Sequence, residues 1–550
     1  MGISIPLRAL QSVKPRGALQ TLSRFVISAF VIAPYLGLNG SSAFAEEANA
    51  GQDSQERGAV VDSSAPTSPP HESCRWFLDP KTFHEPQPGC QPASGGKHAG
   101  GAQRTEEAAL PKPALNVPAN LNTISGLVSS GVLQKSLGLP ADAPLQIGGI
   151  ASFIGNRLTS GGLKPNTSSG ERVFGFNAAL DMERLFPFAP IPGGELFSSM
   201  IQYEGGKASQ YAGSIQGYDS VNAWSEKYGR HRLELYEVYW RQRLLDDRLI
   251  IKVGKIMGAA EFAQPNYPPT IPQDPSRMAW TISDLFFVPV GYLPIFQGKL
   301  PTYANTAWGA IVTVQPTPAI YAKYGFFDGN GIRYETGPRI GPNLNENTFQ
   351  IAEASLSWEL GEERKAGRIS GGFWKQSGLM ATGMLDPIKG GVLLEHGARG
   401  FFAVANQRLW YLNDTDPRGL VGWANFGYSP SQTSAVQHYL GGGVTALGLV
   451  PIRPQDTISF GFAWSRLNQG AIAGTVFASP LPAPWGWPIS PYVSQTRLNS
   501  TERMYQITYR FVLIPGKIVF DAGYTAIPNP GYRPNIPWAN AVTLRSFVVF

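Results

Sequence analysis

The chain has 550 residues, a formal net charge of +6 and only 15% charged residues, whereas soluble globular proteins average about 25%. No stretch of about 18 uncharged apolar residues follows residue 45, which excludes a membrane protein built from spanning helices. A transmembrane β-barrel stays compatible with this composition, because only alternate residues of its strands meet lipid.

The first 45 residues have the three parts of a secretory signal. Four basic residues come first, an apolar stretch covers 25–38, and Ala43-Phe44-Ala45 forms a small-x-small cleavage site. The alternative is a membrane anchor, for which this apolar stretch is short. We therefore expect a cleaved signal peptide over 1–45. Its removal lowers the formal charge from +6 to +2, so no nucleic-acid partner is expected.

Residues 46–118 are rich in Gly, Ser, Ala, Pro, Gln and Glu and poor in aliphatic side chains. Such a segment cannot offset its ordering entropy by burial, so we expect a low-complexity, largely disordered periplasmic extension. Cys74 and Cys90 lie within it, and an oxidising compartment favours a disulfide between them. Free thiols are the alternative. The neighbouring histidines match no standard zinc spacing, so we expect no metal and no cofactor.

Residues 119–144 connect this extension to the rest of the chain. Apolar residues spaced by three and four predict an amphipathic helix over 119–140, which three glycines weaken. Two roles stay open for the segment: a helical linker, or a plug or brace of the barrel.

From residue 145 to the C-terminus, the chain is a succession of strand-like segments separated by turns and loops. Apolar and polar residues alternate with period two in many of them. There are sixteen candidates: 147–156, 172–182, 195–204, 232–244, 248–256, 307–315, 319–327, 349–360, 367–375, 399–411, 419–428, 436–447, 457–467, 502–514, 517–526 and 541–550. Their even number and lengths near ten residues predict a 16-stranded antiparallel transmembrane β-barrel over 145–550.

The C-terminal segment 541–550 shows the alternation clearly. One parity carries its large apolar and aromatic residues: Val542, Leu544, Val548 and Phe550. Arg545 falls on the other parity. Such a strand would invite aggregation at the edge of an open sheet, whereas a closed barrel in lipid has no edge. We expect it to close the barrel beside 147–156, with Arg545 in the lumen and Phe550 read by a barrel-assembly machinery.

The predicted connections alternate in length. The short ones, rich in turn residues, include 245–247, 315–318, 361–367 and 515–516. The ones between them are mostly long: 205–231, 257–306, 328–348, 376–398, 468–501 and 527–540. Short periplasmic turns alternating with long outer loops are typical of outer-membrane barrels, and a soluble sandwich or propeller has no reason to alternate in this way.

The longest connection, 257–306, has about fifty residues, a length that is usually functional inside a compact domain. A sixteen-stranded barrel is wide enough for an aqueous channel. We therefore expect this loop to fold inward and constrict the pore. The alternative is an outward loop that covers only the rim.

Several segments of the chain resemble the carbohydrate-selective porins of the OprB type. They are Leu235–Trp240, Leu244–Lys255, Glu261-Phe262-Ala263, Gly400–Gln407 and Ile527–Gly531, with weaker echoes in Gly175–Leu185 and Tyr439–Gly448. The similarity runs over about residues 145–550. It implies a sixteen-stranded outer-membrane barrel that passes monosaccharides, above all glucose. The family does not require the long segment 46–140, and the lumen loops that set the preferred sugar vary most.

Facilitated diffusion of a sugar needs weak binding at several points. Charged side chains supply hydrogen bonds to sugar hydroxyls, and aromatic rings stack on the apolar sugar faces. The candidate substrate-binding residues are Lys252, Lys323, Arg510 and Arg545 on the wall, with Glu261, Trp280 and Asp284 in the 257–306 loop. Each has a structural alternative, since arginine–carboxylate pairs also brace barrel walls and a tryptophan also packs its own loop. A basic lumen would attract acidic sugars such as gluconate as well.

No enzyme is expected, because none of the six histidines lies in a nucleophile-elbow or metal-binding motif. The alternative function is a barrel that serves as an anchor or adhesin without selective transport, with 46–140 as a partner-binding arm. The expected location is the cell outer membrane. The expected partners are sugars and outer-membrane lipid, and a homotrimer is one option for the assembly.

Overall fold

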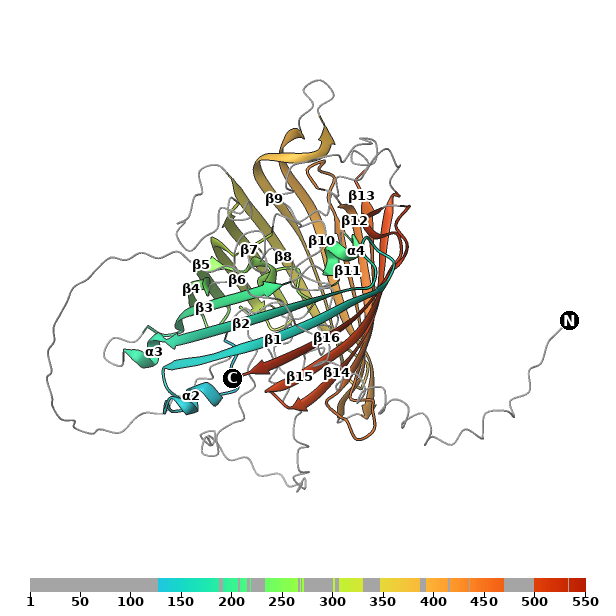
Figure 1. Cartoon of the computed structure of the whole chain (residues 1–550). Coiled ribbons are helices and arrows are strands. Elements are labelled where there is room, and N and C mark those ends of the chain that lie inside the picture. The colour runs from blue at the N-terminus through green and yellow to red at the C-terminus, as the bar shows by residue number, and fades with distance from the viewer. Residues whose placement is uncertain are drawn as a thin grey trace, which may run out of the picture. The chain divides into compact units, whose positions relative to one another are not determined.

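The computed structural model describes residues 127–550 apart from 187–190, 206–207, 215–217, 219–232, 266–267, 269, 272–299, 302–305, 330–346, 386–391, 414–415, 435, 469–498 and 533. Within these residues, sixteen strands form one closed barrel in which each strand lies next to its neighbours in sequence (Figure 1). The predicted 16-stranded antiparallel barrel is therefore confirmed.

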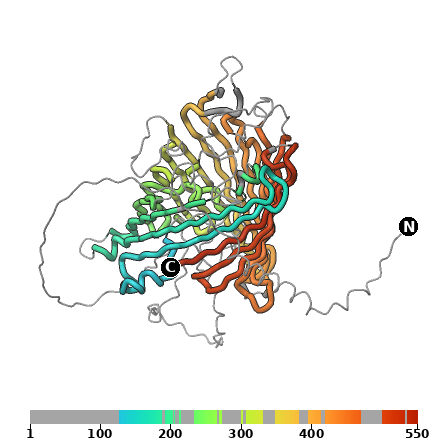
Figure 2. The backbone as a smooth tube through the Cα atoms, viewed as in Figure 1, coloured from blue at the N-terminus to red at the C-terminus, as the bar shows by residue number. Residues whose placement is uncertain are grey.

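The strands run obliquely around the wall of the barrel (Figure 2). Their bounds are β1 (Leu145–Ser160), β2 (Thr167–Asp181), β3 (Gly194–Gly205), β4 (Glu234–Leu244), β5 (Leu249–Ile256), β6 (Ala307–Thr317), β7 (Ile320–Asp328), β8 (Thr348–Leu360), β9 (Lys365–Leu385), β10 (Val392–Asn413), β11 (Asp416–Tyr428), β12 (Val436–Leu447), β13 (Thr457–Leu467), β14 (Thr501–Ile514), β15 (Ile518–Ile527) and β16 (Ala539–Val549).

Helices are short in the described part of the chain. They are α2 (Val132–Ser136), α3 (Met182–Leu185), α4 (Ala208–Ala212), α6 (Gly258–Glu261) and the 3-10 turn η4 (Pro530–Tyr532). No helix among the described residues is long and apolar enough to cross a bilayer.

The barrel closes between its first and last strands. β16 pairs antiparallel with β1 from Ile150 opposite Val549 to Ser160 opposite Asn540, and it pairs with β15 on its other side. Beyond the strand, the backbone of Phe550 exchanges two hydrogen bonds of 2.9 Å with Gly149. Closure satisfies the backbone groups that an edge strand would leave open, which is a requirement inside a membrane. The predicted pairing of the C-terminal strand with the first strand is thus confirmed.

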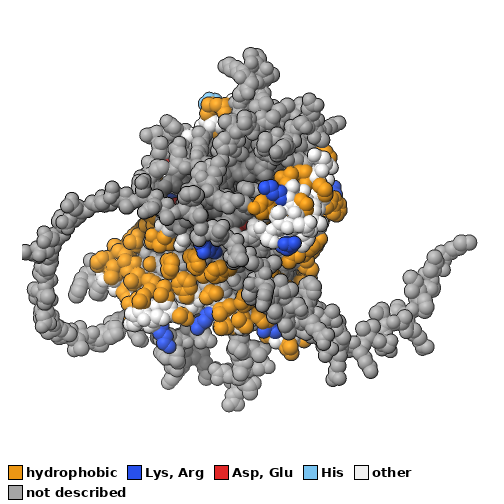
Figure 3. All heavy atoms as spheres, in the orientation of Figure 1, with side chains coloured by type: hydrophobic (Ala, Val, Ile, Leu, Met, Phe, Trp, Pro, Cys, Tyr) orange, Lys and Arg blue, Asp and Glu red, His pale blue; other side chains and the backbone are white. Residues whose placement is uncertain are grey.

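Burial follows the alternation of the sequence. In β16, Val542 is 41% exposed on the outer side, whereas Thr543 and Arg545 are buried on the inner side. In β14, Ile507 is exposed and Gln506 is buried in the same way. Hydrophobic side chains cover the outer wall that faces the viewer in Figure 3, with few Lys and Arg among them. The sheet therefore has an apolar outer face and a polar, charged inner face, as lipid outside and water inside require.

One of the predicted connections differs from expectation. Residues 376–398 were predicted as an outer loop, but β9 and β10 continue through most of this range and pair with each other, from Gln376 opposite Ala398 to Leu385 opposite Val392. The prediction was wrong because glycines and a register shift between His396 and Ala398 interrupt the alternation, while cross-strand pairing extends the ladder regardless.

The segment before the barrel is less helical than expected. Of the helix predicted over 119–140, the described residues form only α2. Gly131 and Gly138, with φ of 73° and 70°, bound it, since left-handed backbone interrupts a helix and favours glycine. The remaining residues, 119–126, lie outside the described part.

Residues 127–129 lie against the inner wall. The side chain of Asn177, on the inner face of β2, accepts from Val128 N at 3.1 Å and donates to Val128 O at 3.2 Å. Ser129 Oγ donates to Ile147 O at 2.9 Å. A Cβ on Gly148 would lie 2.3 Å from Val128 O, so this close approach requires glycine.

Candidate pore-lining site

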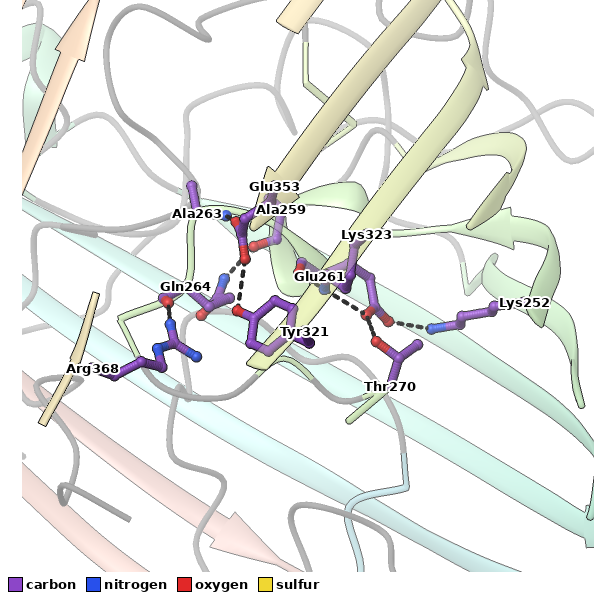
Figure 4. Close-up of polar contacts among 10 residues, drawn as sticks. All are labelled: Lys252, Ala259, Glu261, Ala263, Gln264, Thr270, Tyr321, Lys323, Glu353 and Arg368. Atoms are coloured by element: carbon purple, nitrogen blue, oxygen red, sulfur yellow. Dashed lines mark hydrogen bonds and ion pairs between the residues drawn. The ribbon is translucent and has the colours of Figure 1, made fainter. Parts of the chain in front are cut away.

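Three of the predicted site residues meet at the start of the longest connection. β5 and β7 carry Lys252 and Lys323 on their inward parity, and α6 begins directly after β5 and ends at Glu261. Lys252 Nζ lies 2.7 Å from Glu261 Oε1, and Lys323 Nζ lies 3.8 Å from Glu261 Oε2 (Figure 4). Thr270 Oγ1 donates to Glu261 Oε2 at 2.8 Å. The Lys323 ammonium also donates to the backbone carbonyl of Glu261.

The carboxyl of Glu261 is completely buried. Burial alone would raise its pKa, but the charges of Lys252 and Lys323 and the hydrogen bonds from Lys252 and Thr270 outweigh burial and lower the pKa from 4.5 to about 2. Glu261 is therefore ionised at every physiological pH. Both ammonium groups depend on it for charge compensation, because their side chains are 1% and 0% exposed.

The segment Gly258–Pro265 continues from this cluster along the inner wall. Ala263 N donates to Glu353 Oε2 on β8 at 2.6 Å. Arg368 on β9 donates to the carbonyl of Gln264, and Asn406 on β10 donates to the carbonyl of Pro265. Counting the contacts of Lys252 and Lys323, side chains from five strands hold the segment. Its position is therefore fixed by the wall.

Glu353 also fixes its own neighbours. It accepts from Tyr321 OH at 2.7 Å, and its backbone pairs directly with that of Lys323 (Figure 4). Ala263 itself adopts a φ of 54°, a left-handed conformation that costs a residue with a side chain some strain. The hydrogen bond from its amide to a buried carboxylate helps to stabilise that conformation.

Aromatic side chains line the same part of the wall. Phe262 is fully buried and meets Phe327 edge-on, with ring centroids 6.3 Å apart. Phe349 follows Phe327 at 6.3 Å. Lys323 lies 4.7 Å from the centroid of Phe262, and Lys252 lies 3.6 Å from that of Tyr239. Such cation–π contacts further restrain the two ammonium groups.

The other two wall candidates form a separate cluster on β14–β16. Arg510 Nε and Nη2 lie 2.8 and 3.1 Å from the two carboxylate oxygens of Asp521. Arg545 Nε and Nη2 lie 2.9 and 2.7 Å from Asp521 Oδ2. The three residues are direct ladder neighbours on the inner face. The structure therefore places Arg545 on the inner wall, but it does not bring it to Glu261.

Sequence reasoning missed Glu353, Arg368 and Asp521 as partners of the candidates. Each lies on the inward parity of its strand, so alternation alone marks it as facing the lumen. The missing information was the register, which sets Asp521 opposite both Arg510 and Arg545. Trp280 and Asp284 lie outside the described residues.

Each cluster contains one more base than acid. The first joins Lys252, Lys323 and Arg368 to Glu261 and Glu353, and the second joins two arginines to Asp521. Each of these two clusters therefore offers hydrogen-bonding charges with a weak positive excess. Within the described ranges, no three His, Cys, Asp or Glu side chains are grouped to hold a metal ion.

Known proteins match most of the chain. The model of the family "Carbohydrate-selective porin, OprB family" matches residues 166–550. The chain is similar to the high-pH structure of Pseudomonas putida OprB, with 17% identity and a TM-score of 0.61. The match covers 76% of this chain and 97% of that chain. The low-pH structure of the same protein covers 78% and 99%, with 14% identity and a TM-score of 0.44. The channel DcaP of Acinetobacter baumannii covers 74% and 97%, with 8% identity and a TM-score of 0.39. No curated protein sequence matches the chain.

Proposed function

Because the chain belongs to the carbohydrate-selective porins of the OprB family, we propose that its barrel passes glucose-like monosaccharides by facilitated diffusion through a pore that segment 257–306 constricts. Family and fold make the protein an outer-membrane channel rather than an enzyme. The preference for a monosaccharide and the constriction by this segment are proposals.

One observation supports the proposed constriction. The start of the longest connection, Gly258–Pro265, lies along the inner wall and is bonded to inward-facing side chains of β5, β7, β8, β9 and β10. A loop fastened in this way reduces the cross-section available to solutes. It also brings backbone and side-chain polar groups to the path that a sugar would follow.

The charges support a neutral or weakly acidic solute. In both inner-wall clusters, acids and bases are within ion-pair distance of each other. Paired groups bind a passing hydroxyl weakly, as rapid release requires. The excess of one base in each cluster would allow an acidic sugar to compete, and that preference is the main alternative.

Liposome swelling tests the proposal. Liposomes that contain the full-length protein should swell faster in glucose than in a disaccharide or in gluconate at equal osmolarity. The variant Trp280→Ala should narrow the difference between hexose and disaccharide, whereas Trp538→Ala, which alters an exposed residue before β16, should not. Faster entry of anions would refute the sugar selectivity. An unchanged ranking in Trp280→Ala would remove that residue from the site, and a protein without any conductance would favour an anchor or adhesin.

Two further proposals concern Phe550 and residues 119–144. We propose that a barrel-assembly machinery reads Phe550, whose ring packs against Phe176 at 5.6 Å beside the closing strand pair. We also propose that residues 119–144 brace the barrel, which the contacts of Val128 and Ser129 with β1 and β2 support.

A further inference from the structure

Two exposed cations face each other on the outer side of β9 and β10. Lys375 is the direct ladder partner of Arg399, and both side chains are exposed. The next outward pair toward the short turns is Phe373 opposite Phe401, which are 57% and 58% exposed. The cationic pair therefore borders an apolar surface on its short-turn side. Like charges directly opposite each other destabilise a strand pair unless an anion compensates them.

A second group lies on β13 and β14. Arg466 faces outward one residue before the end of β13, and Arg503 faces outward near the start of β14. Phe460 and Ile507, outward-facing residues of the same strands, are 45% and 49% exposed. Here too, basic residues follow an apolar surface toward the long loops.

The tilt of the strands brings the two groups to a similar height. The ladder row that crosses β10 at Phe401, well inside the strand, reaches β14 at its first residue, Thr501. With strands about 4.8 Å apart and tilted by about 35–45°, such a row climbs by about 3 Å per strand. The rise compensates for the different distances of the four cations from the ends of their strands. Along the barrel axis, the four cations therefore fall within roughly 10 Å of one another. We call them the outer-rim cations: Lys375, Arg399, Arg466 and Arg503.

Among the described residues, the outer-rim cations have no acidic partner. At the short-turn end of the barrel, Arg364 pairs with Glu359 at 2.6 Å and Lys365 pairs with Glu363 at 2.9 Å. Near the long loops, Arg172 pairs with Glu204, so the outer-rim cations differ from these exposed basic residues at both ends in having no acidic partner among the described residues.

The surroundings of the outer rim can supply the missing anion. In barrels of this type the long loops face the cell exterior, so these side chains lie at the headgroup level of the outer leaflet. We propose that the outer-rim cations bind the phosphate groups of a phosphorylated lipid of that leaflet, while Phe373 and Phe401 contact its acyl chains. Arginine binds phosphate through two parallel hydrogen bonds, and basic clusters beside a membrane select anionic headgroups. This interaction is independent of the solute that the pore carries.

Native mass spectrometry with a defined lipid tests the proposal. The delipidated full-length protein, in a non-ionic detergent, is titrated with diphosphoryl lipid A or with the same lipid lacking both phosphates. We expect the phosphorylated form to bind more tightly. The double variant K375Q/R399Q should bind it about 30-fold more weakly, since each basic residue beside an anionic surface contributes about fivefold. The double variant R466Q/R503Q provides a second test on other strands.

The control removes equivalent charges from the opposite end. R364Q/K365Q should bind lipid A as the wild type does, and unchanged ion conductance verifies folding of every variant. Equal affinity for the phosphorylated and dephosphorylated lipids would overturn the proposal, as would wild-type affinity in both outer-rim variants. A variant that binds lipid A normally but changes the oligomeric mass would also overturn it, because it would assign these cations to a contact between copies of the chain.

Discussion

Replacing Glu261 by Gln removes the charge that two buried ammonium groups share. The amide keeps the size of the side chain, but Lys252 and Lys323 lose their anion while their side chains stay 1% and 0% exposed. A carboxyl whose pKa is lowered from 4.5 to about 2 contributes about 3 kcal/mol at neutral pH. Loss of one partner from a buried ion pair costs a similar amount, about 3–5 kcal/mol.

The first consequence should be local. The barrel has its own ladder of strands, so E261Q should release the segment Gly258–Pro265 from the wall before it unfolds the sheet. A loss of about 3 kcal/mol corresponds to about 100-fold faster hydrogen exchange of the amides that docking protects, such as that of Ala263. Single-channel conductance should rise in parallel. The matched control is E359Q, which alters an exposed pair with Arg364 and should change neither quantity.

The same residue predicts a pH dependence. Because the folded-state pKa of Glu261 lies below 4.5, its contribution is complete above that pH and is lost as the pH falls from about 4.5 to about 2. Exchange of the segment in the wild type should therefore accelerate over this window, and E261Q should lack that component. Equal exchange rates in the wild type and E261Q at neutral pH would show that Glu261 does not hold the segment against the wall.

Two further changes affect the β14–β16 cluster and the closing strand pair. Asp521→Asn leaves Arg510 and Arg545 buried without their shared carboxylate, so the free energy of unfolding by urea in lipid vesicles should fall by about 3–5 kcal/mol. Glu204→Gln, in an exposed pair with Arg172, should cost less than about 1 kcal/mol, and equal effects of the two would contradict the assignment. Deletion of Phe550 removes backbone bonds to Gly149 at the closing pair and should lower surface levels more than the conductance of inserted channels. Unchanged surface levels would contradict the role proposed for it.

The strands were predictable because lipid imposes a simple rule on one face. Val542 and Ile507 must be apolar where they meet acyl chains, and Thr543 and Gln506 need not be. Alternation therefore located β14 and β16 to within a few residues. It also assigned Arg545 to the inner wall from a sequence of ten residues.

The failures occurred where pairing rather than pattern determines structure. Residues 376–398 lack steady alternation, yet the extensions of β9 and β10 stabilise each other through their ladder. The partner of Arg510 and Arg545 was equally hidden, since Asp521 becomes their neighbour only once the register is known. Alternation gives the face of a residue, whereas its cross-strand partner depends on two strands at once.

The contacts of Gly258–Pro265 were beyond sequence reasoning for a related reason. Lys252, Glu261 and Lys323 were identified as charged candidates, but nothing in the sequence shows that two lysines from separate strands share one carboxylate. The hydrogen bonds from Arg368 and Asn406 to backbone carbonyls depend on the path of the segment alone. Carbonyls carry no sequence signal.

We propose that this porin binds a monosaccharide weakly inside a narrowed pore. The most direct measurement is the ionic current through single channels in a planar bilayer while glucose is added. We predict that glucose reduces the current in a saturable manner, with a disaccharide less effective at equal concentration and with the saturation weakened in E261Q. A current that falls only in proportion to solution viscosity, equally for every sugar, would contradict the claim.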